Sequence, residues 1–411
     1  MTTLAFKDSL HLLATRRFGT FWFASLLSNI GTWAQQVAQP WLLLSLGASP
    51  FLLGLDSFAL AAPVFLLTLV GGALADAADR RATIVKFQSL QMLCPVLLVV
   101  LLLAGHVQPW MVIGLSLVVG ITDGLSMPSF QSIVPSIVDK QQIPTGIALN
   151  STQFNLSRIM GPAIAGVLMT GVGVAGAFAV SALSYVPFIL VALWVLPVKA
   201  AVAQTRQGMD WCQLKTNVRE ILRQPMLRGA LATVFTSSLL CAPIVVFCPV
   251  LVKETFHGDV SHFSLAVGAF GVGGLLGAIA LMGIEEARDR RPISSGFAIA
   301  YGVVVALAAW NPWAWALPCL FALAGLCMTL SNTSANTLLQ SAASPAIRGQ
   351  TVSLFMLAMR GGMALGGLLT GLCVGWLGIR IALCVNGALA VLIHVAIARQ
   401  WSKVARPVQA T

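Results

Sequence analysis

Residues 174–197 read VAGAFAVSALSYVPFILVALWVLP, which is 24 consecutive residues without a charged side chain. The hydrocarbon core of a bilayer is about 30 Å thick, and an α-helix needs roughly 20 apolar residues to cross it. An apolar stretch that forms a core helix of a soluble protein is usually shorter, about 10–14 residues. The stretch therefore predicts a membrane-spanning helix.

The composition of the whole chain agrees with this prediction. Of its 411 residues, 58% are hydrophobic and 9% are charged, and the mean hydropathy is +0.89. Soluble domains carry roughly 25% charged residues, so this chain lacks the polar surface that would coat a globule in water. Soluble enzymes, secreted disulfide scaffolds and disordered proteins are excluded. The eight cysteines form no CxxC pair, and we expect neither a metal site nor a cofactor.

Eleven further stretches have the length and character of spans, so the predicted fold class is an all-α integral membrane protein with twelve transmembrane helices. One long polar stretch divides them into six and six. We expect an N-terminal six-helix bundle at 1–197, a cytoplasmic central loop at 198–226, and a C-terminal six-helix bundle with a short tail at 227–411. The predicted spans are 19–45, 52–75, 82–104, 109–136, 143–171, 174–197, 227–252, 262–284, 293–310, 313–340, 348–376 and 380–401.

The positions of the basic residues predict the orientation. With the N-terminus taken as cytoplasmic, 20 of the 24 lysines and arginines fall on that side, and only Lys253 and Arg380 fall on the other. Short cytoplasmic loops are enriched in lysine and arginine, which predicts that both termini are cytoplasmic. The net charge of +11 is then a product of topology, and no nucleic-acid partner is expected.

The two halves of the chain resemble each other. Residues 51–81 are matched by residues 263–291, and both segments end in Asp-Arg-Arg; residues 151–158 are matched by residues 353–360. The predicted architecture is therefore two pseudo-repeated six-helix bundles. Secondary transporters often have such repeats, with the substrate path near the midplane and alternating access by rocking of the halves.

The sequence Gly72-Ala-Leu-Ala-Asp76-Ala-Ala-Asp79-Arg80-Arg81 follows the second predicted span. It resembles the loop signature G-x-x-x-D-x-x-G-R-[RK] of the major facilitator superfamily, with Asp79 in place of the usual glycine. The resemblance implies the major facilitator fold and assigns a gating role to Asp76, Arg80 and Arg81. The other interpretation of this segment is a short charged loop at the membrane surface.

The sequence Gly161-Pro162-Ala-Ile-Ala-Gly166 lies in the fifth predicted span. It resembles the G-P-x-x-G-G element of exporters in this superfamily, although Ala165 replaces one glycine. The resemblance favours export and implies that Gly161 and Pro162 contribute to gating. Close helix packing at the glycines and a proline kink would select the same residues.

Three charged residues lie near the middle of predicted spans, where charges are costly and usually functional. We interpret Asp123 as the proton-coupling residue, and Arg158 and Arg360 as cations that bind an anionic or polar substrate. The alternative is structural: an ion pair between Asp123 and Arg158, with Arg360 capped by backbone carbonyls. Asp56 lies one turn inside its span and is expected to be an interfacial charge.

Two spans carry polar stripes. In the first span the stripe consists of Gln35 and the four substrate-binding candidates of that span named below. In the tenth span the polar residues recur every four positions. We expect these stripes to line the substrate path, while interhelical hydrogen-bond seams are the alternative. The predicted substrate-binding residues from the two stripes are Asn29, Thr32, Gln36, Gln39, Asn332 and Asn336.

Asp123 in the fourth span and Arg158 before the Gly-Pro element resemble the residues at these places in the enterobactin exporter branch of the superfamily. The predicted function is a proton-coupled secondary exporter of a small amphipathic or anionic molecule such as a siderophore. A multidrug efflux pump and a lipid flippase are alternatives, and a third class is a membrane protein that transports nothing.

An enzyme is not expected, because the spans lack a Ser/His/Asp, zinc or two-carboxylate constellation. The expected partners are a small-molecule substrate, protons and the lipid bilayer, and the protein is expected to be monomeric. The expected location is the bacterial inner membrane, with multiple spans.

Overall fold

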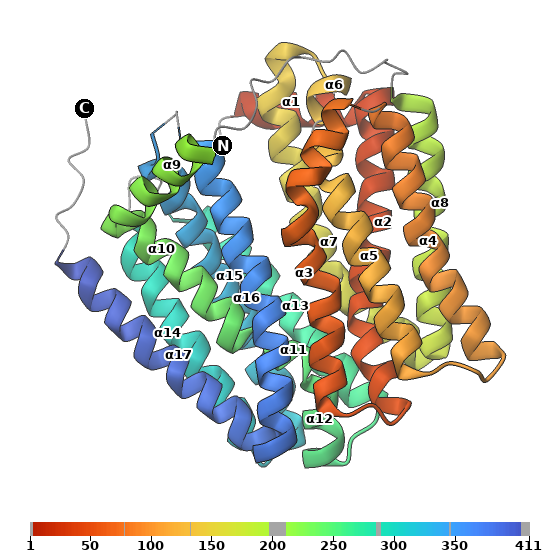
Figure 1. Cartoon of the computed structure of the whole chain (residues 1–411), viewed down its shortest axis with the longest axis vertical. Helices are drawn as coiled ribbons and strands as arrows, with labels where there is room; N and C mark the ends of the chain where they lie inside the picture. The colour runs from red at the N-terminus through yellow and green to blue at the C-terminus, as the bar shows by residue number, and fades with distance from the viewer. Residues whose placement is uncertain are drawn as a thin grey trace. The chain divides into compact units, whose positions relative to one another are not determined.

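The computed structural model describes residues 3–77, 79–131, 133–196, 211–284, 289–344 and 347–403. Within these ranges the chain consists of helices and short connections (Figure 1). Nine of the described helices are long and apolar enough to cross a membrane, and shorter apolar stretches lie at Pro50–Val64 and Met160–Gly171. The prediction of an all-α membrane-spanning chain is therefore confirmed.

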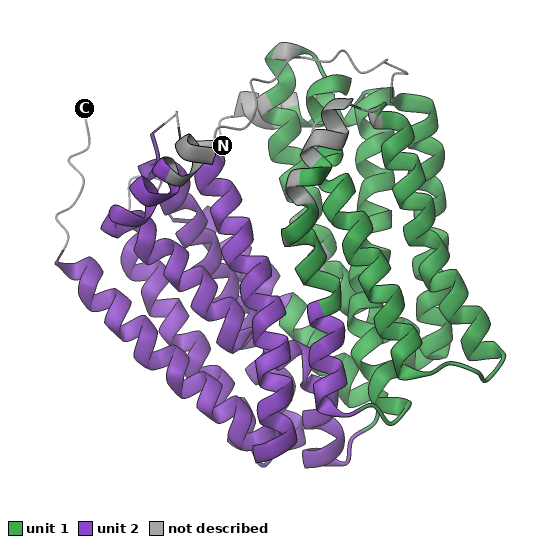
Figure 2. Ribbon diagram, in the orientation of Figure 1, with its two compact units in different colours: residues 1–48, 59–204, 259–271 green, residues 49–58, 205–258, 272–411 purple. Residues whose placement is uncertain are grey.

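The chain divides into two compact units (Figure 2). Unit 1 takes its residues from 1–48, 59–204 and 259–271, and unit 2 from 49–58, 205–258 and 272–411. The units thus follow the two sequence halves except at two places, the first turns of the second and eighth predicted spans. Each of these turns groups with the unit of the other sequence half.

Unit 1 has its apolar core where aromatic side chains from three helices meet. Phe188 packs against Phe21 and Phe130, with ring centroids 6.0 and 5.5 Å apart. The helices of this unit are α1 (Thr3–Ala14), α2 (Arg16–Ser45), most of α3 (Pro50–Ala77), α4 (Arg80–Leu103), α5 (Pro109–Gln131), α6 (Val134–Ile137), a 3-10 turn (Lys140–Gln142), α7 (Ile143–Gly171), α8 (Gly173–Val195) and the start of α13 (Val260–Met282).

Unit 2 has its own core, in which Leu227, Val234 and Trp401 are buried together. Its helices are α9 (Trp211–Arg223), α10 (Pro225–Thr236), a π-helix (η2, Ser237–Cys241), α11 (Pro243–Val246), α12 (Cys248–Val250), a second π-helix (η3, Leu251–Thr255), the rest of α13, α14 (Arg290–Trp310), a 3-10 turn (Ala314–Ala316), α15 (Leu317–Ala342), α16 (Arg348–Leu377) and α17 (Ile379–Ser402).

Two expected spans have other boundaries in the structure. The span expected at 227–252 is broken into α10, α11 and α12 with two π-helical segments, because Pro243 and Pro249 interrupt regular α-helical hydrogen bonding. The span expected to run to residue 136 ends at Gln131 in α5, and α6 follows separately. The central loop expected at 198–226 contains helix α9, while residues 197–210 lie outside the described part. Asp56 is buried, with 5% of its surface exposed, and its place at the membrane interface stays a prediction.

The Asp-Arg-Arg segments of the two halves have the same local structure. Asp79 is the N-cap of α4 and Asp289 is the N-cap of α14, with φ/ψ of −62°/115° and −59°/114°. Each carboxylate accepts a 3.0 Å hydrogen bond from the backbone N–H two residues later, in Arg81 and Arg291. The aspartate in place of glycine therefore caps a helix. The internal repeat inferred from the sequence is confirmed at this point.

Asp259 caps the start of α13 in a related way. Its carboxylate accepts hydrogen bonds from the backbone N–H groups of Ser261 and His262, and the His262 ring nitrogen Nδ1 lies 2.8 Å from it. The hydrogen bond with the His262 side chain holds the pKa of Asp259 below its usual value. The carboxylate therefore stays charged as a cap in mildly acidic solution.

The two segments that group with the unit of the other half are closely packed there. At the start of α3, a Cβ on Gly54 would overlap the backbone carbonyl of Gly367 in α16. At the start of α13, the Phe263 ring stacks on Trp41 of α2 at 5.2 Å. Both segments belong to the internal repeat, which predicts that each of them packs in the unit of the other sequence half.

Helix α16 also packs closely on the first π-helix. A Cβ on Gly362 would lie 3.0 Å from the carbonyl oxygen of Phe235, and one on Gly366 would overlap the carbonyl of Leu239. The glycine spacing lets the two backbones approach, as it does in membrane helix pairs generally. The π-helix and α16 therefore form one packed layer.

We expect Gly366→Ala to destabilise the protein, because the added methyl has to displace the backbone of the π-helix. Overpacking of this kind costs about 1–3 kcal/mol. Gly375→Ala is the control on the same helix, since a Cβ there meets nothing within 4 Å. Thermal unfolding of both variants in the same detergent tests this. An equal midpoint for Gly366→Ala and Gly375→Ala would contradict the packing described here.

Candidate functional site

The intramembrane carboxylate of unit 1 is held by α4. The Nε2 amide of Gln91 donates a 2.6 Å hydrogen bond to Oδ1 of Asp123 in α5, and Gln88 donates a 2.8 Å bond to Oε1 of Gln91. Gln88 and Gln91 are buried, whereas Asp123 is half-buried. A short hydrogen bond to a carboxylate stabilises its charged form, and partial exposure leaves it accessible.

Helix α2 contributes a polar seam to the same unit. Thr32 shares a 2.9 Å hydrogen bond with the hydroxyl of Tyr185 in α8. Gln35 accepts a 3.0 Å bond from Ser181 in α8, and Gln39 donates to Ser116 in α5. Three members of the predicted stripe are thus interhelical hydrogen-bond groups.

The other two members of the α2 stripe, Asn29 and Gln36, are half-buried. The stripe therefore divides into a buried seam and a partly accessible edge. Thr32 and Tyr185 form one hydrogen-bonded pair in this unit, and Gln91 and Asp123 form another. Thr32, Gln91, Asp123 and Tyr185, from α2, α4, α5 and α8, are called the carboxylate cluster below.

The Gly-Pro element of α7 packs against α2. A Cβ on Gly161 would overlap the side chain of Trp33, and Pro162 lies inside α7, which continues to Gly171. Gly161 therefore has a packing role, and a gating role stays a prediction. Arg158 belongs to α7, but its side chain lies outside the described residues.

The predicted gating loop is described only in part. The side chains of Asp76 and Arg80 lie outside the described residues. Arg81 donates its backbone N–H to Asp79, and its side chain is half-buried. The gating role of all three residues stays a prediction.

The intramembrane cation of unit 2 is Arg360, near the middle of α16, and it is half-buried. Within the described part of the chain, its guanidinium has neither a hydrogen-bond partner nor an ion pair. This differs from the buried Arg291, which binds the carboxylate of Asp289 through contacts of 2.9 and 3.1 Å. Arg360 is therefore available to a ligand in a way that Arg291 is not.

Helix α15 carries further polar atoms that lack partners. Oδ1 of Asn332 and the hydroxyls of Ser331 and Ser334 are buried without a hydrogen-bond partner among the described residues. Asn336 differs, since its Oδ1 accepts a 3.1 Å bond from Gln340. Buried polar groups are normally paired, so unpaired groups on one helix are candidates for contact with water or a ligand.

The sequence-based interpretation missed two features. Gln91 and Tyr185 complete the carboxylate cluster, and the signal for them was present: two glutamines three residues apart in an apolar span, and one of only two tyrosines in the chain. The second feature is His394, which is fully buried in α17.

His394 connects α17 to the first π-helix. Its Nδ1 donates a 2.6 Å hydrogen bond to the carbonyl of Ala390, and its Nε2 lies 3.2 Å from the Ser237 hydroxyl and 3.3 Å from the Thr233 carbonyl. Ser237 begins the π-helix. The histidine therefore stabilises the point at which the regular helix ends. Single π-helical turns are frequent at functional sites.

No group of three or more His, Cys, Asp or Glu side chains that could hold a metal occurs in the part of the chain that the structure describes.

Residues 8–408 match the model of the transmembrane secretion effector family, a family of the major facilitator superfamily. The chain belongs to this family. It is a multi-pass membrane transporter that acts on small molecules, and not an enzyme. The family resemblance stated from the loop signature is thereby confirmed.

Two relatives of this chain are themselves transporters. The transporter is 25% identical over 370 residues to the staphyloferrin A transporter of Staphylococcus aureus, covering 87% of this chain and 90% of the relative. It is also 25% identical over 343 residues to the multidrug efflux pump Tap of Mycolicibacterium fortuitum, covering 80% and 82%.

Solved structures confirm the fold. A D-xylose–proton symporter matches with a TM-score of 0.70 and 14% identity, covering 93% of this chain and 97% of that one. A POT family transporter bound to a peptide conjugate matches with a TM-score of 0.72 and 13% identity, covering 95% and 97%. The predicted all-α major facilitator fold is therefore correct.

We expect His394→Ala to destabilise the transporter, because it leaves a cavity and removes the ring from Ser237 and the Ala390 carbonyl. The expected loss is about 2–4 kcal/mol. His106→Ala is the control, since His106 is exposed in a connection. The unfolding midpoints in detergent are the measurement, and a His394→Ala midpoint equal to that of His106→Ala would refute the anchoring role.

Proposed function

We propose that the transporter exports a small anionic molecule, of the siderophore class, in exchange for protons. Arg360 is the observation that carries the proposal. It is a cation near the middle of a span, it is half-buried, and it lacks a counter-ion among the described residues. Charges in spans are rare and usually contact a substrate, an ion or each other. An anionic substrate would supply the missing partner.

Polar groups on other helices extend the proposed set of substrate contacts. Asn332 has a buried carbonyl oxygen without a partner, which suits a hydroxyl or amide donor of the substrate. Asn336, Asn29, Thr32, Gln36, Gln39 and Arg158 complete the proposed set of substrate-binding residues. The staphyloferrin A relative supports the siderophore class.

Asp123 is the proposed proton carrier. Its carboxylate is half-buried within α5 and held by Gln91 at 2.6 Å. In the charged state it accepts the amide hydrogen bond, and in the protonated state it becomes a donor itself. Proton binding therefore changes the hydrogen bonding of the carboxylate cluster, which is what coupling requires. A proton-coupled relative of the same fold supports this assignment.

The proposed cycle is alternating access. Asp76, Arg80, Arg81, Gly161 and Pro162 are the proposed gating residues. The proposed organisation is a monomer with six-helix bundles at 1–197 and 227–411. We place it in the bacterial inner membrane with both termini cytoplasmic, on the distribution of basic residues.

Binding of iron-free staphyloferrin A to purified protein tests the substrate class. Arg360→Ala removes a charged hydrogen bond worth about 1.5–3 kcal/mol, so we expect the affinity to fall about 10- to 150-fold. Arg380→Ala is the matched control, because it removes the same charge at the start of α17, where Arg380 contacts the carbonyl of Asn311. Unchanged affinity in Arg360→Ala would refute an anion site at this residue.

Proton flux in proteoliposomes tests the coupling. Asp123→Asn keeps the shape of the side chain but cannot carry a proton, so we expect substrate-driven proton movement to fall to the level of protein-free vesicles. Asp259→Asn is the control, since Asp259 is exposed and lies before α13. If Asp123→Asn still moved protons at the wild-type rate, another residue would be the carrier.

Multidrug efflux is the second candidate, favoured by the relationship to the pump Tap. A lipophilic cation such as tetraphenylphosphonium distinguishes the two. A multidrug site would bind this cation, and loss of the Arg360 charge would leave that binding unchanged or tighten it. The anion-site proposal expects no transport of the cation by the wild-type protein.

A further inference from the structure

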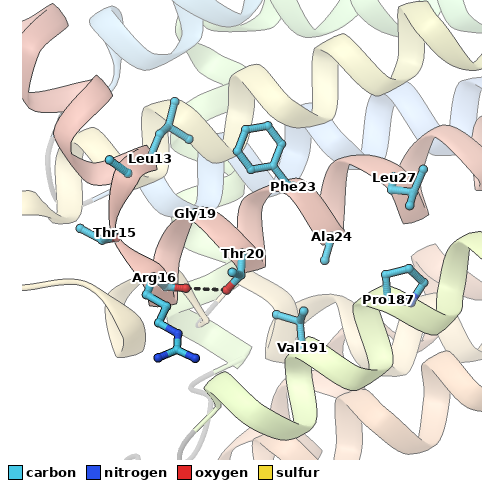
Figure 3. A pocket seen from close by; sticks show the side chains of 11 residues that line it. Leu13, Thr15, Arg16, Gly19, Thr20, Phe23, Ala24, Leu27, Pro187 and Val191 are labelled. Carbon is cyan, nitrogen blue, oxygen red and sulfur yellow. Dashed lines mark hydrogen bonds between the residues drawn. The ribbon is translucent and has the colours of Figure 1, made fainter.

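A groove of about 530 Å³ lies on unit 1, beside the break between α1 and α2 (Figure 3). One end of the groove is polar, with the side chains of Arg16 and Thr20. The other end is apolar, with Phe23 and Leu27 from α2 and Pro187 and Val191 from α8. The groove is made by one unit alone and contains none of the residues assigned to transport above.

Arg16 is fixed at the polar end of the groove. Its guanidinium carbon lies 5.1 Å from the centroid of the Trp194 ring of α8. Trp194 is 54% exposed at the end of its helix, a position typical of the aromatic belt at a membrane interface. The cation–π contact keeps the charge of Arg16 at the level of the lipid headgroups.

The charge of the groove is of one sign. None of its lining residues is acidic, and Arg17 follows Arg16 directly. Basic residues at a membrane surface attract anionic lipids. A phosphate at the polar end would meet the guanidinium of Arg16, while the hydroxyl of Thr20 donates its hydrogen to the carbonyl oxygen of Arg16 at 2.6 Å (Figure 3).

The apolar end has the length that a lipid needs. Phe23 and Leu27 are 59% and 47% exposed, so a hydrocarbon chain has access to both. Leu27 follows Arg16 by 11 residues, which is about 16 Å along a helix. One leaflet of the hydrocarbon core is about 15 Å thick. The groove therefore offers a cation at headgroup depth and an apolar wall across one leaflet.

We propose that this groove binds an anionic phospholipid, with its phosphate at Arg16 and one acyl chain along Phe23, Leu27 and Val191. A free inorganic anion would use the polar end only and leave the apolar wall unoccupied. A neutral hydrocarbon would use the apolar wall only and leave the charge unpaired. A lipid with both parts occupies the whole groove, independently of what the transporter exports.

The experiment measures binding of phosphatidylglycerol to the full-length protein in detergent by native mass spectrometry, with phosphatidylcholine as the reference lipid. Arg16→Gln removes the proposed contact. Arg17→Gln removes the same charge from an exposed neighbour that does not line the groove, so loss of general electrostatic attraction is common to both variants. The difference between the variants reports the contact itself.

We expect phosphatidylglycerol to bind Arg16→Gln about tenfold more weakly than Arg17→Gln, from the strength of a hydrogen bond between charged groups. Trp194→Leu keeps the charge but removes the ring that holds it, and an intermediate loss is expected. Equal weakening in Arg16→Gln and Arg17→Gln would overturn the proposal, because it would reduce the effect to non-specific attraction.

Two further measurements separate the source of the anion. Inorganic phosphate should fail to displace the lipid at millimolar concentration, and Leu27→Gln should weaken lipid binding although the charge of the groove is intact. Displacement by phosphate, or full lipid affinity in Leu27→Gln, would show that the groove recognises a free anion and would overturn the lipid assignment. Equal unfolding midpoints of the variants exclude misfolding as the cause.

Discussion

The interior of a bilayer offers no hydrogen-bond partner to the protein backbone, and the rest of this structure depends on that constraint. Every backbone group in a span has to be paired within its own helix, so the apolar stretches fold as helices. The two π-helices between Ser237 and Thr255 depart from the regular α-helical pattern. Pro243 and Pro249 withhold two N–H groups there, and the side chain of His394 together with the glycine face of α16 surrounds the first irregular turn. The departure from regular helix is stabilised from both sides.

The same constraint applies to polar side chains in the spans, so whether each one has a hydrogen-bond partner indicates its role. In unit 1 several of them are paired: Gln35 with Ser181, Thr32 with Tyr185, and Gln91 with Asp123. In unit 2 several lack partners among the described residues, including Arg360 and the carbonyl oxygen of Asn332. The two units therefore differ in chemistry although they repeat in sequence. A held carboxylate in unit 1 suits proton binding, and an unpaired cation in unit 2 suits an anionic substrate.

The repeat itself is preserved most closely where it determines backbone geometry. Asp79 and Asp289 have nearly the same dihedral angles and cap their helices in the same way, although glycine is usual at the first position in the superfamily signature. The first turns of α3 and α13 are also equivalent in the repeat, and each groups with the unit of the other sequence half. The central polar residues have diverged: the charge near the middle of α5 is Asp123, and the charge near the middle of α16 is Arg360.

The sequence by itself determined the fold class, the internal repeat and the family. These depend on the length of apolar runs and on local motifs, which a single chain displays without tertiary contacts. It also identified Asp123 and Arg360, because a charge inside an apolar run is visible as such. Only the tertiary structure decided which polar residues are already paired. Gln35 and Gln36 are neighbours in one stripe, yet one is hydrogen-bonded to α8 and the other is half-buried, because a turn of 100° per residue directs them to different surroundings. The break in the seventh span, the anchoring by His394 and the lipid groove at Arg16 likewise depend on contacts between segments distant in sequence, and periodicity along one helix does not contain that information.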